Sequence, residues 1–153
     1  MLTTKLLNII FLADDDADDR DFFAEALKDL KVNSQLTMSK DGVELMTNLK
    51  LITTEPPPPH VIFLDLNMPF KNGFECLEEI KNNTRLKNIP VAIFSTSAND
   101  NDVLTTYSLG ANCFICKPTS HIQLKKVIET VLMLDLWKQN QQLPKEKYVL
   151  TIN

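Results

Sequence analysis

The sequence predicts an α/β domain built on a doubly wound parallel sheet of five strands, in the order 2-1-3-4-5, with helices on both faces. The first observation behind this prediction is that short apolar runs alternate five times with segments of helical periodicity, which is typical of βαβ units. The second is that right-handed crossovers between such units favour this strand order. Strands one and three should then lie side by side in the sheet.

The first half of the chain is predicted to hold two strands and two helices. Leu6 to Ala13 is an apolar run that predicts a strand, and Ala17 to Lys31 carries apolar residues at helical spacing. Gln35 to Ser39 predicts a weaker second strand, and Gly42 to Leu51 predicts its helix. Thr53 to Pro59 ends in four prolines, which lack backbone donors, so we interpret this segment as a stiff connector and not as a polyproline ligand.

The second half is predicted to hold three strands, each followed by a helix. The strands are His60 to Leu64, Pro90 to Phe94 and Asn112 to Cys116; the helices begin at Asn72-Gly73, at Asp100 and after the N-cap Ser120, and the last one ends near Asn140. Gly110 suits the end of the fourth helix. We expect one domain over residues 1–140 and a C-terminal tail over residues 141–153, whose β-like segment Tyr148 to Leu150 has no predicted place.

Composition and charge exclude several classes of function. Hydrophobic residues make up 44% and charged residues 24% of the 153 residues, as in ordinary globular domains. The net charge of −4 argues against a nucleic-acid partner. The sequence has no signal peptide and no membrane-spanning apolar run, so we expect a cytoplasmic protein without a membrane partner. Cys113 and Cys116 fall in a predicted strand and are expected to be buried and inert.

Four predicted strands end in side chains that suit phosphoryl chemistry. Asp14 and Asp15 close the first strand, Asp65 the third, Ser95 the fourth and Lys117 the fifth. Ligands of open α/β sheets bind at the carboxyl ends of the strands. Carboxylates with a backbone carbonyl make an oxygen site for Mg²⁺, and the cation would let Asp65 stay ionised as a nucleophile toward phosphorus. Lys117 and Ser95 would then contact the phosphoryl oxygens.

In these residues the chain resembles the receiver domain of two-component response regulators, over about residues 6 to 138. The matching features are Asp14-Asp15, Asp65 with Met68-Pro69 and Asn72-Gly73 after it, Ser95, and Lys117-Pro118. The resemblance implies a flavodoxin-like fold and phosphorylation of Asp65 by a sensor histidine kinase or a histidine phosphotransfer protein. It implies a signalling module that catalyses only its own phosphorylation and dephosphorylation, not an enzyme with a separate substrate.

The resemblance also implies ligands for a cation. Asp14, Asp15 and Asp65, with the backbone carbonyl of Asn67, would hold Mg²⁺ or Mn²⁺.

Further implied roles concern the response to phosphorylation. Ser95 and Phe114 would move together as a switch, although phenylalanine stands where tyrosine is frequent. Asn67 and Ser97 would influence the lifetime of the phosphoryl group, and the Lys117-Pro118 bond would be cis.

The surface formed by the fourth helix, fifth strand and fifth helix would bind a downstream protein that the sequence does not identify. We expect Thr105, Tyr107 and Ser108 on this surface. It also offers a place for a homodimer contact, as do the last helix and the tail.

Two alternatives at the acidic cluster and at Asp65 come from other classes of protein. The residues Asp14, Asp16, Asp18 and Glu25 match an EF-hand calcium loop in spacing, but Asp19 stands where that loop needs glycine, and a strand precedes it. A haloacid-dehalogenase-like phosphatase would carry a second aspartate at position 67, where this chain has asparagine. A phosphorylation-independent protein-interaction module is the remaining alternative.

Other polar residues are interpreted as structural. Asp18, Asp19 and Asp21 are expected to be solvated acids favoured by the positive end of a helix dipole. His60 and His121 are expected to be structural or solvent-facing, because nothing pairs either of them with a nucleophile.

Overall fold

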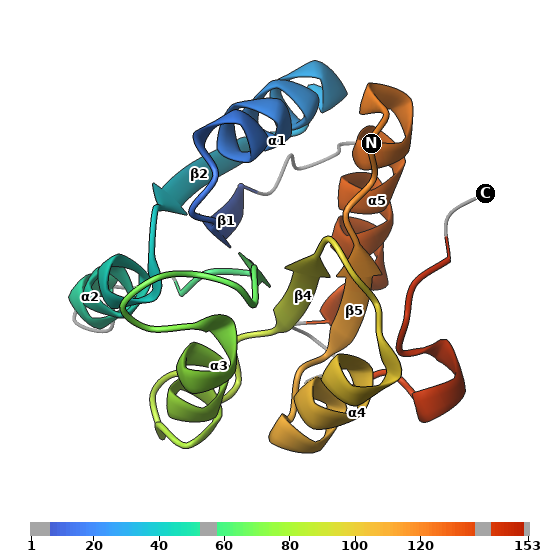
Figure 1. Cartoon of the computed structure of the whole chain (residues 1–153). Coiled ribbons are helices and arrows are strands. Elements are labelled where there is room, and N and C mark those ends of the chain that lie inside the picture. Colours follow the sequence, from blue (N-terminus) through green and yellow to red (C-terminus); the bar gives the residue numbers. More distant parts are fainter. Residues whose placement is uncertain (1–6, 53–57, 137–141, 152–153) are drawn as a thin grey trace.

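The computed structural model describes residues 7–52, 58–136 and 142–151, and its centre is a five-stranded parallel sheet (Figure 1). The strand order is β2-β1-β3-β4-β5, so the predicted topology is confirmed. The strands are β1 (Asn8–Ala13), β2 (Ser34–Ser39), β3 (Val61–Leu64), β4 (Val91–Ser95) and β5 (Cys113–Cys116). Because β1 lies between β2 and β3, the chain changes its direction of winding at β1 and β3.

Among the described residues, five helices cover the two faces of the sheet, as predicted. They are α1 (Ala17–Leu30), α2 (Gly42–Ile52), α3 (Gly73–Lys81), α4 (Asp100–Leu109) and α5 (His121–Leu134). Helices α1 and α5 pack together on one face over a cluster that includes Ile10, Phe63 and Phe94, whereas α2, α3 and α4 cover the other face over Phe11, Leu64 and Phe114. Successive residues of each buried strand thus enter opposite cores, which explains why the strands are apolar throughout.

Side-chain caps fix the starts of the helices near the carboxyl edge of the sheet. Asp16 caps α1 by accepting from the Asp19 amide, and Asn72 forms a capping box with Glu75 at the start of α3. Each such cap is worth about 1 kcal/mol. Because α1 and α3 follow the strands that carry Asp14 and Asp65, these caps hold the two loops of the candidate site.

The last helix of the sheet layers, α5, ends at Leu134, because Asp135 adopts a left-handed conformation (φ 51°, ψ 46°) there. The predicted helix end near Asn140 falls outside the described residues. Aspartate tolerates this conformation better than most residues. The predicted strand start at Leu6, the first prolines of the connector and residues 137–141 lie outside the described residues.

The three cysteines are free, and they differ in exposure. Cys76 and Cys113 are buried, and burial raises the pKa of each thiol to about 12. Cys116 is exposed, so the prediction that it is buried is wrong, because this end of β5 opens toward the loop at the carboxyl edge of the sheet.

Within the described ranges, no helix combines the length and apolar character that crossing a membrane requires.

The described part of the C-terminal tail lies against the outer edge of β5. A short 3₁₀ helix, η1 (Lys145–Lys147), leads into Tyr148, which is only 1% exposed. Val149 then forms an isolated parallel bridge with Phe114. The β-like segment of the tail therefore extends the sheet by one short contact.

Candidate functional site

Pairing between β1 and β3 brings two of the predicted carboxylates together. Ala13 and Leu64 are partners in the register, so Asp14 and Asp65 leave the sheet side by side. The Asp65 amide donates to the Ala13 carbonyl (3.0 Å), and the Asp14 amide donates to the Ser39 carbonyl (3.0 Å). Both side chains are therefore positioned by strand backbone and not by mobile loops.

Asp14, Asp15 and Asp65 form an acidic cluster in which one carboxylate oxygen from each residue lies within 4.8 Å of the others. Asp14 and Asp65 are buried and Asp15 is exposed. Three carboxylates at this spacing match the oxygen ligands that small divalent cations prefer.

Lys117 lies among these carboxylates. Its Nζ atom is 2.7 Å from Asp14 Oδ2, 3.0 Å from Asp19 Oδ2 and 3.4 Å from Asp65 Oδ2. The Lys117 amide donates to the Ser95 carbonyl (2.7 Å), which fixes the end of β5 against β4. Burial lowers the pKa of Lys117, but the carboxylates of Asp14, Asp65 and Asp19 outweigh that effect and leave this pKa above its usual value. Lys117 is thus a permanent cation at this edge of the sheet.

The pKa of Asp65 is raised from 3.8 to about 6. Burial is the largest cause, and Asp14 adds to it, whereas Lys117 and the Asn67 amide act in the opposite direction. A second positive charge beside Asp65 would therefore favour its ionised, nucleophilic form.

The donor set fits a divalent cation. Asp14 Oδ2 is buried, and among the described residues no hydrogen-bond donor is aligned with it, although Lys117 Nζ lies 2.7 Å away as an ion-pair partner. Lys117 is one positive charge among the three carboxylates of this cluster, so a coordinated cation would offset the negative charge that remains. Asp14, Asp15 and Asp65 are the residues that would supply carboxylate ligands.

Ser95, Ser97 and Asn67 lie at the same edge of the sheet. Ser95 is 1% exposed, and its Oγ atom accepts from the Ser97 amide at 3.4 Å. Asn67 is exposed, and its amide donates to Asp65 Oδ1 at 3.3 Å. Asn67 is thus in direct contact with Asp65, whereas Ser95 is linked to the site through its carbonyl, which accepts from the Lys117 amide.

Phe114 is the second residue of β5, away from the carboxyl edge of the sheet, and it is completely buried. Its backbone pairs with Ile93 of β4, and its ring packs edge-on against Tyr148 of the tail, with 6.2 Å between ring centroids. The predicted switch residue thus connects the sheet to the tail. The cis form of the Lys117-Pro118 bond stays a prediction.

Two residues of α1 contact the site although sequence reasoning gave them no such role. Asp19, which we expected to be solvated, forms the 3.0 Å ion pair with Lys117. Arg20 donates from Nη1 to the Asp14 carbonyl at 2.8 Å. Their position in the first turn after the acidic pair was the available signal, because that turn begins at the mouth of the cluster.

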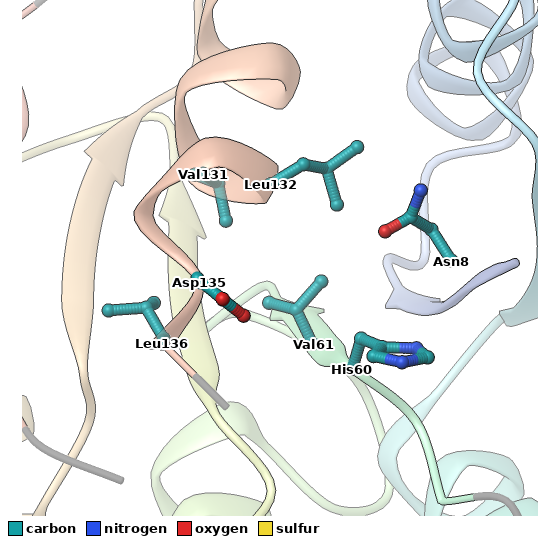
Figure 2. A pocket seen from close by; sticks show the side chains of 7 residues that line it. All are labelled: Asn8, His60, Val61, Val131, Leu132, Asp135 and Leu136. Atoms are coloured by element: carbon teal, nitrogen blue, oxygen red, sulfur yellow. The ribbon is translucent and has the colours of Figure 1, made fainter. Parts of the chain in front are cut away.

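The two histidines lie away from this cluster, as expected. His60 accepts from the Ile9 amide through Nδ1 (3.0 Å), and His121 contacts Asp29 at the surface (2.8 Å). Figure 2 shows His60 beside a small pocket that is lined by Asn8, Val61, Val131, Leu132, Asp135 and Leu136. Because Asn8 and Val61 begin their strands, this pocket lies at the edge of the sheet opposite Asp65.

Comparison with known proteins identifies one family. The family model of the response regulator receiver domain matches residues 10–129. The response regulator Rcp1 of Synechocystis sp. is 35% identical over 138 residues, which cover 89% of this chain and 92% of that protein.

Solved structures give the same result. The Mn²⁺-bound form of Rcp1 superposes with a TM-score of 0.71 at 36% identity, covering 81% of this chain and 91% of that one. The phosphorylated cyanobacterial phytochrome response regulator RcpA superposes with a TM-score of 0.75 at 35% identity, covering 91% of this chain and 99% of that one.

Proposed function

This chain belongs to the response regulator receiver domain family, and we propose that it accepts a phosphoryl group on Asp65 from a histidine kinase or a histidine phosphotransfer protein. The observation that carries this proposal is the position of Asp65, a buried carboxylate 3.4 Å from Lys117 Nζ and within one cation's reach of Asp14 and Asp15. Receiver domains are signalling modules and not conventional enzymes.

In the proposed reaction an oxygen of Asp65 bonds to phosphorus as the bond from phosphorus to the donor nitrogen breaks. The donor imidazole takes up a proton, and the product is an aspartyl-phosphate. A divalent cation held by Asp14, Asp15, Asp65 and the Asn67 carbonyl would supply positive charge to the phosphoryl oxygens.

The remaining residues position and sense the phosphoryl group. Lys117 already lies beside Asp65. On phosphorylation its ammonium group would leave Asp14 and Asp19 and bind one phosphoryl oxygen. Ser95 would donate its hydroxyl to another oxygen. Asn67, whose amide contacts Asp65, and Ser97, whose amide contacts Ser95, would affect the access of water and hence the lifetime of the phosphoryl group.

The proposed output surface is formed by α4, β5 and α5. The switch from Ser95 to Phe114 would alter this surface, which carries exposed Leu104, Thr105 and Ile122. Residues 1–140 would act as the receiver, and the tail over residues 141–153 would add to its surface. A downstream protein or a second copy of the chain would bind there.

Intact mass spectrometry after incubation with acetyl phosphate and Mg²⁺ tests this function. We expect one phosphoryl adduct, which EDTA prevents and which borohydride reduction maps to the peptide containing Asp65. A protein that takes up no phosphoryl group from acetyl phosphate or from phosphohistidine donors would instead be a phosphorylation-independent binding module. Multiple turnover of a phosphate ester would indicate a phosphatase.

Removal of the metal ligand Asp14 gives a second prediction. Mg²⁺ binds the folded state only, so it should raise the melting temperature of the wild type, by an amount equivalent to about 2.7 kcal/mol at a hundredfold excess over Kd. An Asp14→Asn variant should lose most of this Mg²⁺-dependent increase, as measured by differential scanning fluorimetry.

Asp21→Asn is the matched control for this prediction, because Asp21 is an exposed acid of α1 outside the cluster. Its melting temperature should rise with Mg²⁺ as in the wild type. An equal rise in the Asp14→Asn variant would place the cation elsewhere.

A further inference from the structure

Tyr148 is the most deeply buried residue of the described tail, residues 142–151. Its ring is 1% exposed and packs edge-on against Tyr107 of α4, with 5.0 Å between centroids, and against Phe114 of β5. Its hydroxyl donates to Thr106 Oγ1 at 2.7 Å. Thr106 is itself completely buried and donates to backbone carbonyls of α4. The slot between α4 and β5 is therefore shaped for a tyrosine and satisfies its polar end.

Backbone groups of the tail pair with the outer edge of β5. The Phe114 amide donates to the Tyr148 carbonyl (2.9 Å), and the Leu150 amide donates to the Phe114 carbonyl (2.9 Å). Near the start of the described tail, the Leu143 amide donates to the Asn112 carbonyl (3.0 Å). The Gln142 side-chain amide donates to the carbonyls of Tyr107 and Ala111, each at 2.7 Å.

This combination is the general pattern by which sheet edges recognise extended segments. Main-chain pairing supplies affinity for any extended backbone, and a pocket for one side chain supplies selectivity. The pairing here is an isolated bridge and not a continuous ladder. The Tyr148 slot therefore fixes which residue of an extended segment enters.

We propose that the outer edge of β5, with the slot between Thr106, Tyr107 and Phe114, is a binding site for an extended segment with a tyrosine anchor. Residues 142–150 are its resident ligand within the same chain, and an outside segment of this kind enters only when the resident leaves. Because a tethered ligand has an effective concentration of roughly millimolar, the resident excludes weak competitors.

The test uses a peptide of residues 142–153, titrated into the full-length protein while NMR records the amide signals of Thr106 and Phe114. We expect weak binding to the wild type. The full-length Tyr148→Ala variant, whose own tail lacks the anchor, should bind the peptide at least about tenfold more tightly, because intramolecular competition is removed. A peptide with the same Tyr148→Ala change should bind neither protein.

Two results of the titration would overturn the proposal. If the variant binds no better than the wild type because neither binds, the edge is not a recognition site. If both bind equally tightly, the tail is not the resident ligand in cis, and a second copy of the chain becomes the source of the segment.

Hydrogen exchange of the wild type keeps the proposal testable if the variant fails to fold. A displaceable tail predicts that the amides of Leu150 and Phe114 exchange at least about tenfold faster than that of Ile93 in the interior of the sheet, through local opening. Equal protection of all three amides would mean that the tail leaves only on global unfolding, and would overturn the proposal. Neither measurement depends on phosphoryl transfer.

Discussion

An Asp65→Asn variant is expected to take up no phosphoryl group and, without metal, to be more stable than the wild type at neutral pH. The loss of uptake follows because an amide is not a nucleophile toward phosphorus. The gain in stability follows because the wild-type fold disfavours the charge on Asp65, whose pKa is raised from 3.8 to about 6, chiefly by burial. Asparagine keeps the shape of the side chain and carries no charge.

The gain in stability of the Asp65→Asn variant should depend on pH, because the raised pKa of Asp65 makes the stability of the wild type depend on pH. Between pH 3.8 and about 6 the native state keeps the Asp65 proton that the unfolded chain loses. The free energy of unfolding therefore falls as pH rises through this window and stays lower above it. In EDTA the Asp65→Asn variant should exceed the wild type by about 1–2 kcal/mol at pH 7.5, once solvent screening is allowed for, and by little at pH 4.

Urea unfolding in EDTA at both pH values, together with the intact-mass assay, measures the two effects. Asp29→Asn is the matched control, because Asp29 is an exposed residue of α1 whose partner is His121. It should take up a phosphoryl group normally. Uptake by the Asp65→Asn variant would move the phosphoacceptor to another residue, and a wild type that is more stable at neutral pH would contradict the charge argument.

A Gly73→Ala variant is expected to lose both stability and phosphoryl uptake. A Cβ atom at position 73 would lie 2.2 Å from the Asp65 carbonyl oxygen and 2.7 Å from the Leu66 Cα atom, far inside van der Waals contact. Both neighbours are backbone atoms, so β3 and the start of α3 must separate. Overpacking of this kind costs about 3 kcal/mol or more, and the required movement displaces Asp65 itself.

Gly110→Ala is the matched control for this change. Gly110 has a φ of 101°, so alanine is strained there, by about 1–2 kcal/mol. Its Cβ would come no closer than 3.4 Å to the Lys81 side chain, however, and it lies far from Asp65 in the fold. We expect a lower urea midpoint with normal uptake for Gly110→Ala, and loss of both for Gly73→Ala. Normal uptake by the Gly73→Ala variant would show that the loop tolerates the separation.

The sheet and the acidic cluster could be predicted because both depend on local patterns. Buried parallel strands are apolar runs, and the crossover rule then fixes their order without any knowledge of side-chain contacts. Asp14 and Asp65 follow adjacent strands, so their proximity follows from strand order alone.

Other features depend on contacts that no local pattern encodes. The sequence has no glycine or proline between Leu134 and Pro144, so nothing local marks the left-handed turn at Asp135. Asp19 reads as an ordinary acid of a first helical turn, and its contact with Lys117 joins residues 98 positions apart. The slot for Tyr148 is equally nonlocal, because its walls come from α4 and β5.

Because the three cysteines differ in exposure, the number of thiols that react with a reagent distinguishes the folded from the unfolded protein. A thiol reagent should modify one cysteine per chain in the native protein, Cys116, because Cys76 and Cys113 are buried with a pKa of about 12. After denaturation it should modify all three. The rate at which the second and third thiols react then reports the opening of both cores, since Cys76 of α3 belongs to one core and Cys113 of β5 to the other.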